Sequence, residues 1–485
     1  MDRQILQTVL RNDFKSFVRR VFMDVASDST YLDNWHIDVV CNAIWDMYAG
    51  NNNRLIVNIP PRSMKSIICS VALPAFLLGH NPKASIICAS YSDELAAKFA
   101  NDCRNVMLSD WYCGLFPFTR LHKSRRAVTD FETTRGGGRL ATSIGGTLTG
   151  RGGDWIIIDD PLKPIEAFSD LQREKVNEWY GSTLYSRLND KNTGKILLIM
   201  QRLHQNDLTG HLLASNANFK LIRLPAIAEE DENWQITSRI TGKPRIITRA
   251  KGELLHPARE GMDAIAGIRN ALGEFAFAGQ YQQRPSPAEG GIIKREWLHW
   301  YNSLPERFDY IIISWDTAVY TGEKNAFTAC VVLGVADKKI YFLECFKERM
   351  EFPELIKRIP QVHTLMYEKY NTADRRGYRH VETLIEEASS GVQAIQQLKR
   401  EHSDMRIIGI KPTLDKITRL ATMSPFIENG TALFPADADN RCKDFLDELL
   451  MFPAVAFKDQ CDALSQGLEY AVAIINRPIA RATIF

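Results

Sequence analysis

The sequence predicts an α/β protein in which two domains follow one another along the chain. In the N-terminal half, continuous apolar runs alternate with helix-like segments, which is typical of a parallel sheet covered on both faces. In the C-terminal half, three apolar runs are joined by short turns, which indicates an antiparallel meander. With 485 residues, the chain is also too long for one ordinary core.

The composition is ordinary for a globular protein, with 45% hydrophobic and 24% charged residues. A net charge of +2 excludes a strongly basic nucleic-acid binder but allows local basic patches. The longest apolar run, Ile67 to Leu78, is too short for a bilayer and contains Pro74, so we expect no membrane segment. The nine cysteines lack C-x-x-C spacing, which argues for reduced thiols in a cytoplasm and against zinc.

A candidate phosphate-binding loop lies in LIVNIPPRSMKSII, residues 55–68. A strand-like run ends at two prolines and continues through a short loop into a helix-like segment, the layout of a P-loop. Lys65 would reach the terminal phosphates of ATP, and Ser66 would ligate Mg²⁺. Met64 stands where the motif has its second glycine, so a Pro-bounded turn with an incidental Lys-Ser pair stays possible. The predicted nucleotide contacts in the loop are Pro61, Arg62, Ser63, Met64, Lys65 and Ser66.

Five strand-like runs are expected in this half, at residues 55–59, 84–90, 153–161, 194–202 and 220–225. The carboxyl ends of parallel strands share one edge, where ligands bind. The third run ends in Asp159 and Asp160, the form of a Walker B element. Asp159 would hold the Mg²⁺, and Asp160 would orient or deprotonate the attacking water. Two acids after a strand are also common as a helix cap or a turn.

Three other residues are candidates for nucleotide contacts, and Arg62 in the loop has a further candidate role. Gln201 and Arg202, at the end of the fourth run, could sense the γ-phosphate. Arg62 could supply positive charge to the phosphoryl oxygens of the transition state. Trp35 could flank the adenine, although its spacing also fits core packing.

The stretch from Arg135 to Asp154 contains eight glycines and three arginines. Two interpretations stay open: a mobile surface loop with tight turns, or a contact with DNA phosphate or with a neighbouring subunit's nucleotide. From about Ala226 the pattern loosens, and a Pro/Gly-rich stretch ends near residue 290. We therefore predict an N-terminal domain at 1–225, a junction at 226–290 and a second domain at 291–485.

The C-terminal half shows the element order of a ribonuclease-H-like fold. Strand-like runs at residues 308–318, 327–335 and 339–346 form the meander, and a helix-like segment precedes a fourth strand within 381–391. A fifth strand, RIIGIKP, and alternating helix-like segments follow, the last beginning near Asp459.

Carboxylates occur at corresponding places in these elements. Asp316 ends the first strand, Glu386 ends the fourth, and Asp459 and Asp462 lie on one face of the last helix. Two-metal hydrolysis of a phosphodiester needs such acids to hold two Mg²⁺ or Mn²⁺ about 3.5–4 Å apart. The last two acids could also be ordinary first-turn residues that stabilise a helix.

Together these segments resemble the large subunit of the tailed-bacteriophage terminases, the DNA-packaging motors. The similar segments cover nearly the whole chain in order: PPRSMKS, YSDELAAKFANDCR, GGTLTGRGGDWIIIDDPLK, QRLHQNDLTG, QYQQRPSPAEGG, SWDTA, IEEASSG, GIKPTLDK and KDQCDALSQ. The resemblance implies a P-loop ATPase domain of the RecA/ASCE type followed by a ribonuclease-H-like nuclease domain.

The resemblance also assigns roles to residues. Lys65 and Ser66 would bind the ATP phosphates and Mg²⁺, Asp159 would be the Walker B acid, and Asp160 stands where many relatives have the catalytic Glu. The metal-binding acids would be Asp316, Glu386 and Asp459 or Asp462. Two departures are Met64 in the loop and Lys458, where relatives often have another acid.

The activity that the resemblance implies is ATP-driven movement of double-stranded DNA into a procapsid, with cutting by the nuclease domain. The implied partners are the portal protein, a small terminase subunit and further copies of the chain, in a ring of about five subunits. The implied location is the host cytoplasm, with transient docking on the procapsid.

Two other function classes fit the same motifs less fully. One is a helicase-like remodelling ATPase whose ribonuclease-H-like domain only binds DNA. The other makes the C-terminal half a docking domain for a shell or portal, which would not need the set of acids.

Overall fold

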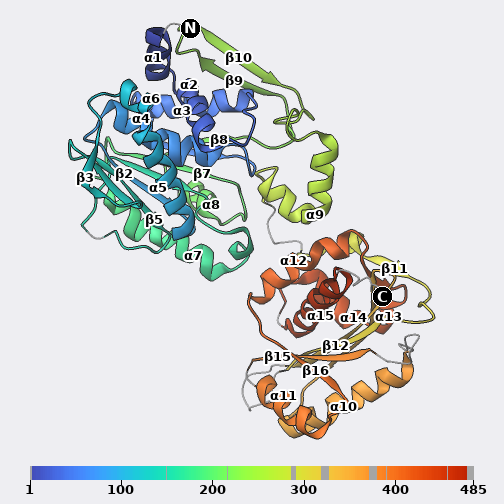
Figure 1. The fold of residues 1–485 in the computed structure, drawn as a ribbon. Helices are drawn as coiled ribbons and strands as arrows, with labels where there is room; N and C mark the ends of the chain where they lie inside the picture. Colours follow the sequence, from blue (N-terminus) through green and yellow to red (C-terminus); the bar gives the residue numbers. More distant parts are fainter. Residues whose placement is uncertain are drawn as a thin grey trace, which may run out of the picture. The chain divides into compact units, whose positions relative to one another are not determined.

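The computed structural model describes residues 3–148, 150–215, 217–285, 291–317, 327–370, 380–388, 390–455 and 457–477. The chain forms two compact units (Figure 1). The N-terminal unit comprises Met1–Arg269 and Glu274–Ser286, and the C-terminal unit comprises Asn270–Gly273 and Pro287–Phe485. Each unit is built around a sheet of its own.

The sheet of the N-terminal unit has the strand order β3-β4-β5-β2-β6-β7-β1-β8. From β5 onward in this order all neighbours are parallel, whereas β3 and β4 form an antiparallel edge. The strands are β1 (Arg54–Asn58), β2 (Ser85–Ser90), β3 (Leu121–Arg126), β4 (Asp130–Thr133), β5 (Gly138–Ser143), β6 (Trp155–Asp159), β7 (Lys195–Met200) and β8 (Lys220–Arg223). The five strands predicted from apolar runs are β1, β2, β6, β7 and β8, and their parallel arrangement is confirmed.

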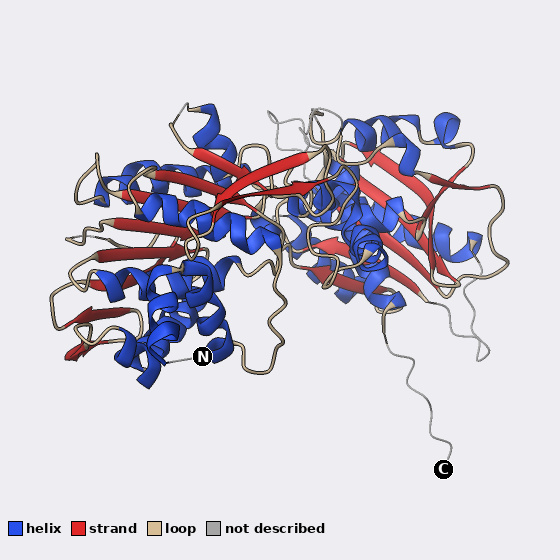
Figure 2. Cartoon of the chain, turned by 90° about the horizontal axis from the view of Figure 1, so that it is seen from above, coloured by secondary structure: helices blue, strands red, loops and turns tan. Residues whose placement is uncertain are grey.

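Both faces of this sheet are buried, which explains the continuous apolar runs of its strands. Leu55 and Val57 face one core cluster, and Ile56 between them faces another. The first face is covered by α1 (Arg3–Asn12), α2 (Phe14–Val25), α3 (Trp35–Tyr48), η1 (Ile67–Ala72), α4 (Leu73–His80), α5 (Asp93–Leu108) and α6 (Asp110–Leu115). The second is covered by α7 (Asp170–Trp179), η3 (Tyr180–Leu184) and α8 (Leu208–Ala214). Figure 2 shows helices on either side of the strands.

Most of the predicted junction belongs to the N-terminal unit rather than forming a separate linker. It contains the antiparallel hairpin of β9 (Glu232–Thr237) and β10 (Pro244–Arg249), followed by α9 (Met262–Gln280). Ile236 and Ile247 are buried in the first core cluster, so isolated apolar residues among many charges are enough to attach the hairpin. The predicted boundary near residue 290 falls in 286–290, outside the described residues.

The sheet of the C-terminal unit has the order β11-β17-β14-β13-β12-β15-β16. The strands β12, β13 and β14 form the predicted antiparallel meander, and β15 and β16 continue it in parallel. The strands are β11 (His299–Tyr301), β12 (Tyr310–Asp316), β13 (Thr328–Ala336), β14 (Lys339–Glu348), β15 (Val381–Glu386), β16 (Arg406–Ile410) and β17 (Ala432–Pro435). The ribonuclease-H-like order is confirmed, with β11 and β17 as an edge that the sequence did not predict.

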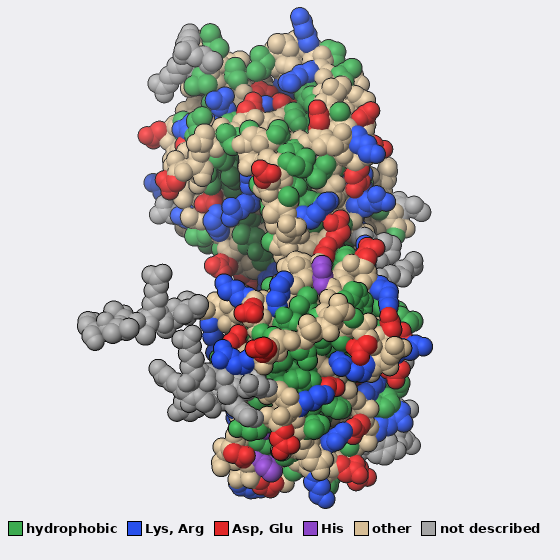
Figure 3. Space-filling view, turned by 90° about the vertical axis from the view of Figure 1, so that its right-hand side faces the viewer, with side chains coloured by type: hydrophobic (Ala, Val, Ile, Leu, Met, Phe, Trp, Pro, Cys, Tyr) green, Lys and Arg blue, Asp and Glu red, His purple; other side chains and the backbone are tan. Residues whose placement is uncertain are grey.

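Helices cover both faces of this second sheet as well. One core cluster joins the sheet to α12 (Lys416–Glu428), α13 (Ala438–Arg441), α14 (Lys443–Met451) and α15 (Asp459–Ile475). The other joins it to α10 (Phe352–Lys369) and α11 (Ser390–Glu401). No helix among the described residues is both long and apolar enough to cross a bilayer. Basic and acidic side chains are interspersed on the surface seen in Figure 3, as a net charge of +2 leads one to expect.

Candidate functional sites

The predicted phosphate loop connects the carboxyl end of β1 to a helical segment that begins at Lys65. Arg62 and Met64 have φ angles of 57° and 62°, so both lie in the left-handed region. This conformation costs a residue with a Cβ atom ~1–2 kcal/mol. Met64 therefore adopts the backbone conformation for which the motif normally uses glycine.

Lys65 is buried and points at the ends of the neighbouring strands. Its Nζ lies 2.7 Å from Asp160 Oδ2 and 3.4 Å from Gln201 Oε1. Asp160 also has a positive φ of 44°, and its Oδ1 accepts a hydrogen bond from the backbone N–H of Gln201 at 3.1 Å. The structure thus brings together three residues that the sequence places on separate segments.

Asp159 lies at the buried end of β6, next to the start of the helical segment. Its Oδ2 accepts a hydrogen bond from Ser70 Oγ at 2.8 Å. Burial and the adjacent Asp160 raise the pKa of Asp159 to about 6, while Lys65 and the hydroxyls of Ser70 and Ser66 lower it. A buried carboxylate beside Ser66 is a donor set that suits Mg²⁺, which prefers oxygen ligands. Ser70 was not predicted, because a serine in an apolar helix gives no signal in the sequence.

Three predicted nucleotide contacts are placed differently from this group. Arg62 is exposed and has no ion pair among the described residues. The Arg202 guanidinium is held by buried Asp207, with Nε to Oδ2 at 2.9 Å, so it is not free to sense a phosphate. The Trp35 ring packs against the core beneath the buried guanidinium of Arg249, 5.7 Å from its centroid, so that face cannot stack on an adenine.

The Gly-rich stretch is partly a strand, contrary to the interpretation of a mobile loop. Gly138–Ser143 forms β5, paired in parallel with β2. Arg139 on this strand is fully buried and donates a hydrogen bond to the carbonyl oxygen of Ser70 at 3.2 Å. Arg151 is ion-paired with Asp130. Arg139 is therefore enclosed in the unit, whereas Arg151 remains exposed in a surface ion pair.

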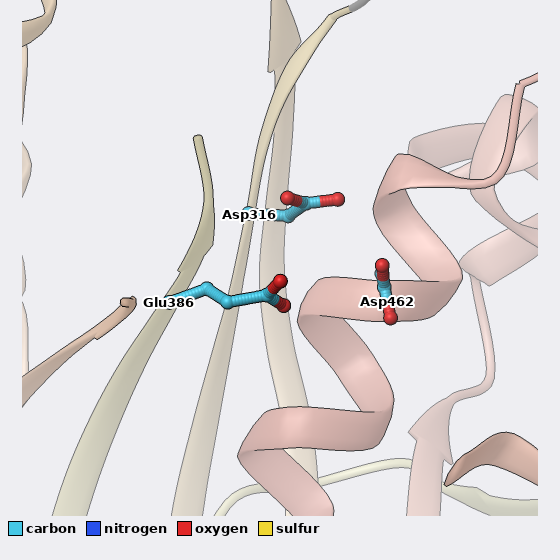
Figure 4. Close-up of side chains that lie close together, drawn as sticks. All are labelled: Asp316, Glu386 and Asp462. Atoms are coloured by element: carbon cyan, nitrogen blue, oxygen red, sulfur yellow. The ribbon is translucent and has the colours of Figure 1, made fainter. Parts of the chain in front are cut away.

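In the C-terminal unit three carboxylates from three elements converge (Figure 4). Asp316 ends β12, Glu386 ends β15, and Asp462 lies in the first turn of α15. One oxygen atom of each lies within 4.8 Å of the others. The parallel pairing of β12 with β15 puts the first two acids on one edge, and α15 packs across the same sheet.

Asp459 lies one helical turn before Asp462 but is not in this close group of the described residues. Of the two alternatives left open by the sequence, the structure places Asp462 with Asp316 and Glu386. The Asp459 carboxylate still lies near the three acids, because its Oδ1 is 3.7 Å from Lys416 Nζ.

Two cations on α12 complete the cluster, and the sequence analysis did not predict them. Lys416 Nζ lies 2.9 Å from Asp316 Oδ2 and 2.5 Å from Asp462 Oδ2. The Arg419 guanidinium bridges Glu386 Oε2 at 3.0 Å and Asp462 Oδ1 at 2.5 Å. Their spacing of three residues puts both on one helix face. A Lys and an Arg near a helix start normally indicate a solvated face, so this pattern carries no functional signal by itself.

Burial is the main cause that raises the pKa of Asp316 to about 7, and the nearby Asp462 adds to it, while Lys416 lowers it. The pKa of Asp462 is also raised by burial, against the opposing effects of Lys416 and Arg419. Burial alone would lower the pKa of Lys416, but Asp316 and Asp462 outweigh it and hold this pKa above its usual value. The three acids form an all-oxygen donor set, which fits Mg²⁺ or Mn²⁺ better than a soft metal.

The comparisons with known proteins agree with this second site. Residues 313–471 match the family model described as "Terminase RNaseH-like domain", a range that contains all three convergent acids and both cations. No curated protein matches the chain.

Among solved structures, the chain is similar to the large terminase of a thermophilic bacteriophage, at 12% identity and a TM-score of 0.47, covering 88% of this chain and 94% of that one. The large terminase of bacteriophage HK97 is 13% identical with a TM-score of 0.36, over 88% and 90% of the chains. The nuclease domain of the human cytomegalovirus terminase is 10% identical with a TM-score of 0.30, over 38% and 98%. The family match covers about a third of the chain, and it is the comparison that bears on the second site.

Proposed function

We propose, from the match of residues 313–471 to the terminase RNaseH-like domain and from the resemblance of the sequence to large terminase subunits, that the protein is a viral DNA-packaging motor with its own nuclease. It hydrolyses ATP to move double-stranded DNA into a procapsid, and it cuts concatemeric DNA by two-metal endonuclease chemistry. The observation that carries the proposal is the convergence of Asp316, Glu386 and Asp462 within the range that matches the terminase RNaseH-like domain.

In the proposed ATPase cycle, the Lys65 ammonium leaves its ion pair with Asp160 and binds the terminal phosphates of ATP instead. Released from that ion pair, the Asp160 carboxylate can accept a proton from the attacking water or orient it. Ser66 and Asp159 would hold Mg²⁺, which supplies charge neutralisation at the phosphates. The exposed Arg62 side chain is free to approach a phosphoryl group, in the same subunit or in a neighbour.

In the proposed nuclease, Asp316, Glu386 and Asp462 would hold divalent cations, with Asp459 as an additional ligand nearby. Two Mg²⁺ or Mn²⁺ ions would activate a water and stabilise the leaving oxygen of the phosphodiester. The protein contributes the fixed arrangement of the acids, because two lie on rigid strand ends and the third lies on a packed helix.

The partners follow from the same proposal. The substrate would be double-stranded DNA, which a small terminase subunit would deliver. The DNA would enter the procapsid through its portal protein. A ring of about five copies would work on the portal. The protein would act in the host cytoplasm and leave the filled particle.

The test is an assay of ATP turnover and of cleavage of long duplex DNA by the purified full chain, with Mg²⁺ or Mn²⁺. Lys65→Ala should abolish DNA-stimulated ATP turnover while metal-dependent nicking persists, and Asp316→Asn should show the reverse. Unchanged ATP turnover in Lys65→Ala would remove the motor assignment.

Metal-dependent cleavage also separates this proposal from the helicase-like alternative. Absence of cleavage under all metal conditions, together with strand separation driven by ATP, would favour a remodelling ATPase whose second domain only binds DNA.

A further inference from the structure

Lys416 is placed among the acids in a way that an ordinary surface lysine is not. Its ammonium contacts Asp316 Oδ2 and Asp462 Oδ2 within 2.9 Å and lies 3.7 Å from Asp459 Oδ1. Two of the three convergent acids therefore direct an oxygen at this ammonium. A divalent cation bound by these oxygens would sit ~2.0–2.6 Å from them, in the space that the ammonium fills.

Arg419, one turn further along α12, has a different environment. Only 6% of its side chain is exposed, against 40% for Lys416. Its two terminal nitrogens bridge Glu386 and Asp462, so it fixes the distance between an acid on a strand and an acid on a helix. A planar guanidinium can make this bridge, whereas an ammonium cannot.

The two cations also differ in how easily they can leave the cluster. Lys416 is the first residue of α12 and its flexible side chain is partly exposed, so its ammonium can turn into solvent without disturbing the core. Withdrawal of Arg419 would leave its buried guanidinium and the Glu386 carboxylate without this ion pair, which is strongly unfavourable for buried charges.

We propose that Lys416 is a built-in counter-ion of the acid cluster that a divalent cation must displace, while Arg419 is a positioning residue that stays in place. This inference rests on the proposed nuclease function, because it concerns the metal site of that function. Lys416 thereby sets the metal concentration at which the nuclease becomes loaded, and Arg419 sets the geometry of Glu386 and Asp462 that the metal meets.

The test is a titration of the full chain with Mn²⁺ alone, without nucleotide or DNA, at pH 8, in which bound Mn²⁺ is measured by electron paramagnetic resonance. The bound Mn²⁺ that is lost in Asp316→Asn is the Mn²⁺ held by the acid cluster, and the Mn²⁺ that remains is bound elsewhere. Lys416→Gln should bind Mn²⁺ at least about tenfold more tightly than the wild type, since one competing charge is removed. Lys416→Arg, which keeps that charge, should bind like the wild type.

Two further variants complete the design. Lys399→Gln removes one exposed lysine from α11 and should leave Mn²⁺ affinity unchanged. Arg419→Lys keeps the charge but not the bridge, and should weaken Mn²⁺ binding by about threefold or more.

The outcomes separate this inference from the proposed function. Binding that depends on Asp316 but is not tightened by Lys416→Gln overturns the inference alone. Mn²⁺ binding that is identical in the wild type and Asp316→Asn overturns the metal site, and with it both proposals. Tightening by both Lys416→Gln and Arg419→Lys would contradict the division of roles between the two cations.

Discussion

At the scale of single residues, the phosphate loop is built from backbone conformations that its side chains do not favour. Arg62 and Met64 in the loop have positive φ angles although neither is glycine, and so does Asp160, which follows β6 and pairs with Lys65. Residues in such conformations persist where the surrounding structure holds them, and they concentrate at functional sites. Here the neighbouring strands and the Lys65–Asp160 ion pair provide that support.

Variants at Met64 test how much the loop depends on this conformation. Met64→Gly should stay within ~1 kcal/mol of the wild type in unfolding free energy, because relief of the left-handed backbone offsets lost packing. Met64→Val should lose ~1–2 kcal/mol and reduce ATP turnover, because a β-branched residue tolerates this conformation worst. Denaturant unfolding and a turnover assay measure both effects. Equal stability of the Gly and Val variants would contradict the strain argument.

The raised pKa of Asp316 predicts a pH dependence of stability. With a folded pKa of about 7 against an ordinary value of 3.8, the native state binds more protons than the unfolded state between these values. The contribution of Asp316 to the free energy of unfolding therefore falls as pH rises from about 4 to about 7. Asp316→Asn removes this titration and should be more stable than the wild type at pH 8 by more than ~1 kcal/mol.

Denaturant unfolding at pH 5 and pH 8 checks this expectation. Asp309→Asn, at an exposed acid just before the same strand, is the matched control and should not change the pH dependence. A wild type that gains stability between pH 5 and pH 8, with no difference in Asp316→Asn, would rule the explanation out.

The sequence predicted site residues correctly where a polar side chain directly follows a buried parallel strand. Lys65, Asp160 and Gln201 each follow an apolar run, so the shared edge of a parallel sheet was enough to bring them together. Lys416 and Arg419 could not be found in this way, because they lie in the first turn of a helix and not at the end of a parallel strand. Which charged side chain meets which is decided by tertiary packing and not by local pattern.

At the scale of elements, the first turn of α15 is fixed by a side chain from another helix. Buried Glu448 on α14 accepts hydrogen bonds from the backbone N–H groups of Gln460 and Cys461 at 2.8 and 3.0 Å. Its other oxygen is paired with Lys347 Nζ at 2.8 Å. A carboxylate at the N-terminus of a helix accepts hydrogen bonds from its free backbone N–H groups and interacts favourably with the helix dipole. Glu448 thereby orients the turn that carries Asp459 and Asp462.

Loss of this cap should affect both stability and the metal site. Glu448→Ala should cost ~3–5 kcal/mol, because it leaves Lys347 and the helix end without their partner. It should also weaken Mn²⁺ binding, because the acids on the first turn lose their fixed orientation. Asp447→Ala, at the exposed neighbour on α14, should do neither. A Glu448→Ala protein with wild-type Mn²⁺ affinity would show that the turn is positioned by other contacts.

Element prediction followed the strength of the local signal. The strands β1, β6 and β12 carry long β-branched or aliphatic runs that are buried on both faces, so their sequences reveal them. The strand β5 begins with glycine and β17 has only four residues, and neither has a distinctive pattern. They form because an existing strand offers a partner, which is a non-local cause.

At the scale of the whole molecule, each unit has hydrophobic clusters of its own on both faces of its sheet. Such units generally unfold as separate cooperative transitions. We expect an ATP analogue with Mg²⁺ to raise the midpoint of one transition and Mn²⁺ alone to raise the other. A free ligand concentration of 100 times the dissociation constant would add ~2.7 kcal/mol to the free energy of unfolding of the unit that binds the ligand.

Calorimetry of the full chain measures both transitions. Lys65→Ala should remove only the shift caused by the nucleotide, and Asp316→Asn only the shift caused by Mn²⁺. A single transition that both ligands move would show that the units unfold together.

The pairing of the acid cluster with Lys416 and Arg419 separates the folding of the C-terminal unit from its loading with metal. Small zinc domains need the ion in order to fold, because nothing else compensates their ligands. Here protein cations already offset much of the buried negative charge. A chelator should therefore stop DNA cleavage and remove only the rise in unfolding midpoint that Mn²⁺ causes, while the circular dichroism spectrum shows that this unit stays folded. A newly synthesised chain could then fold fully while it is still unable to cut DNA.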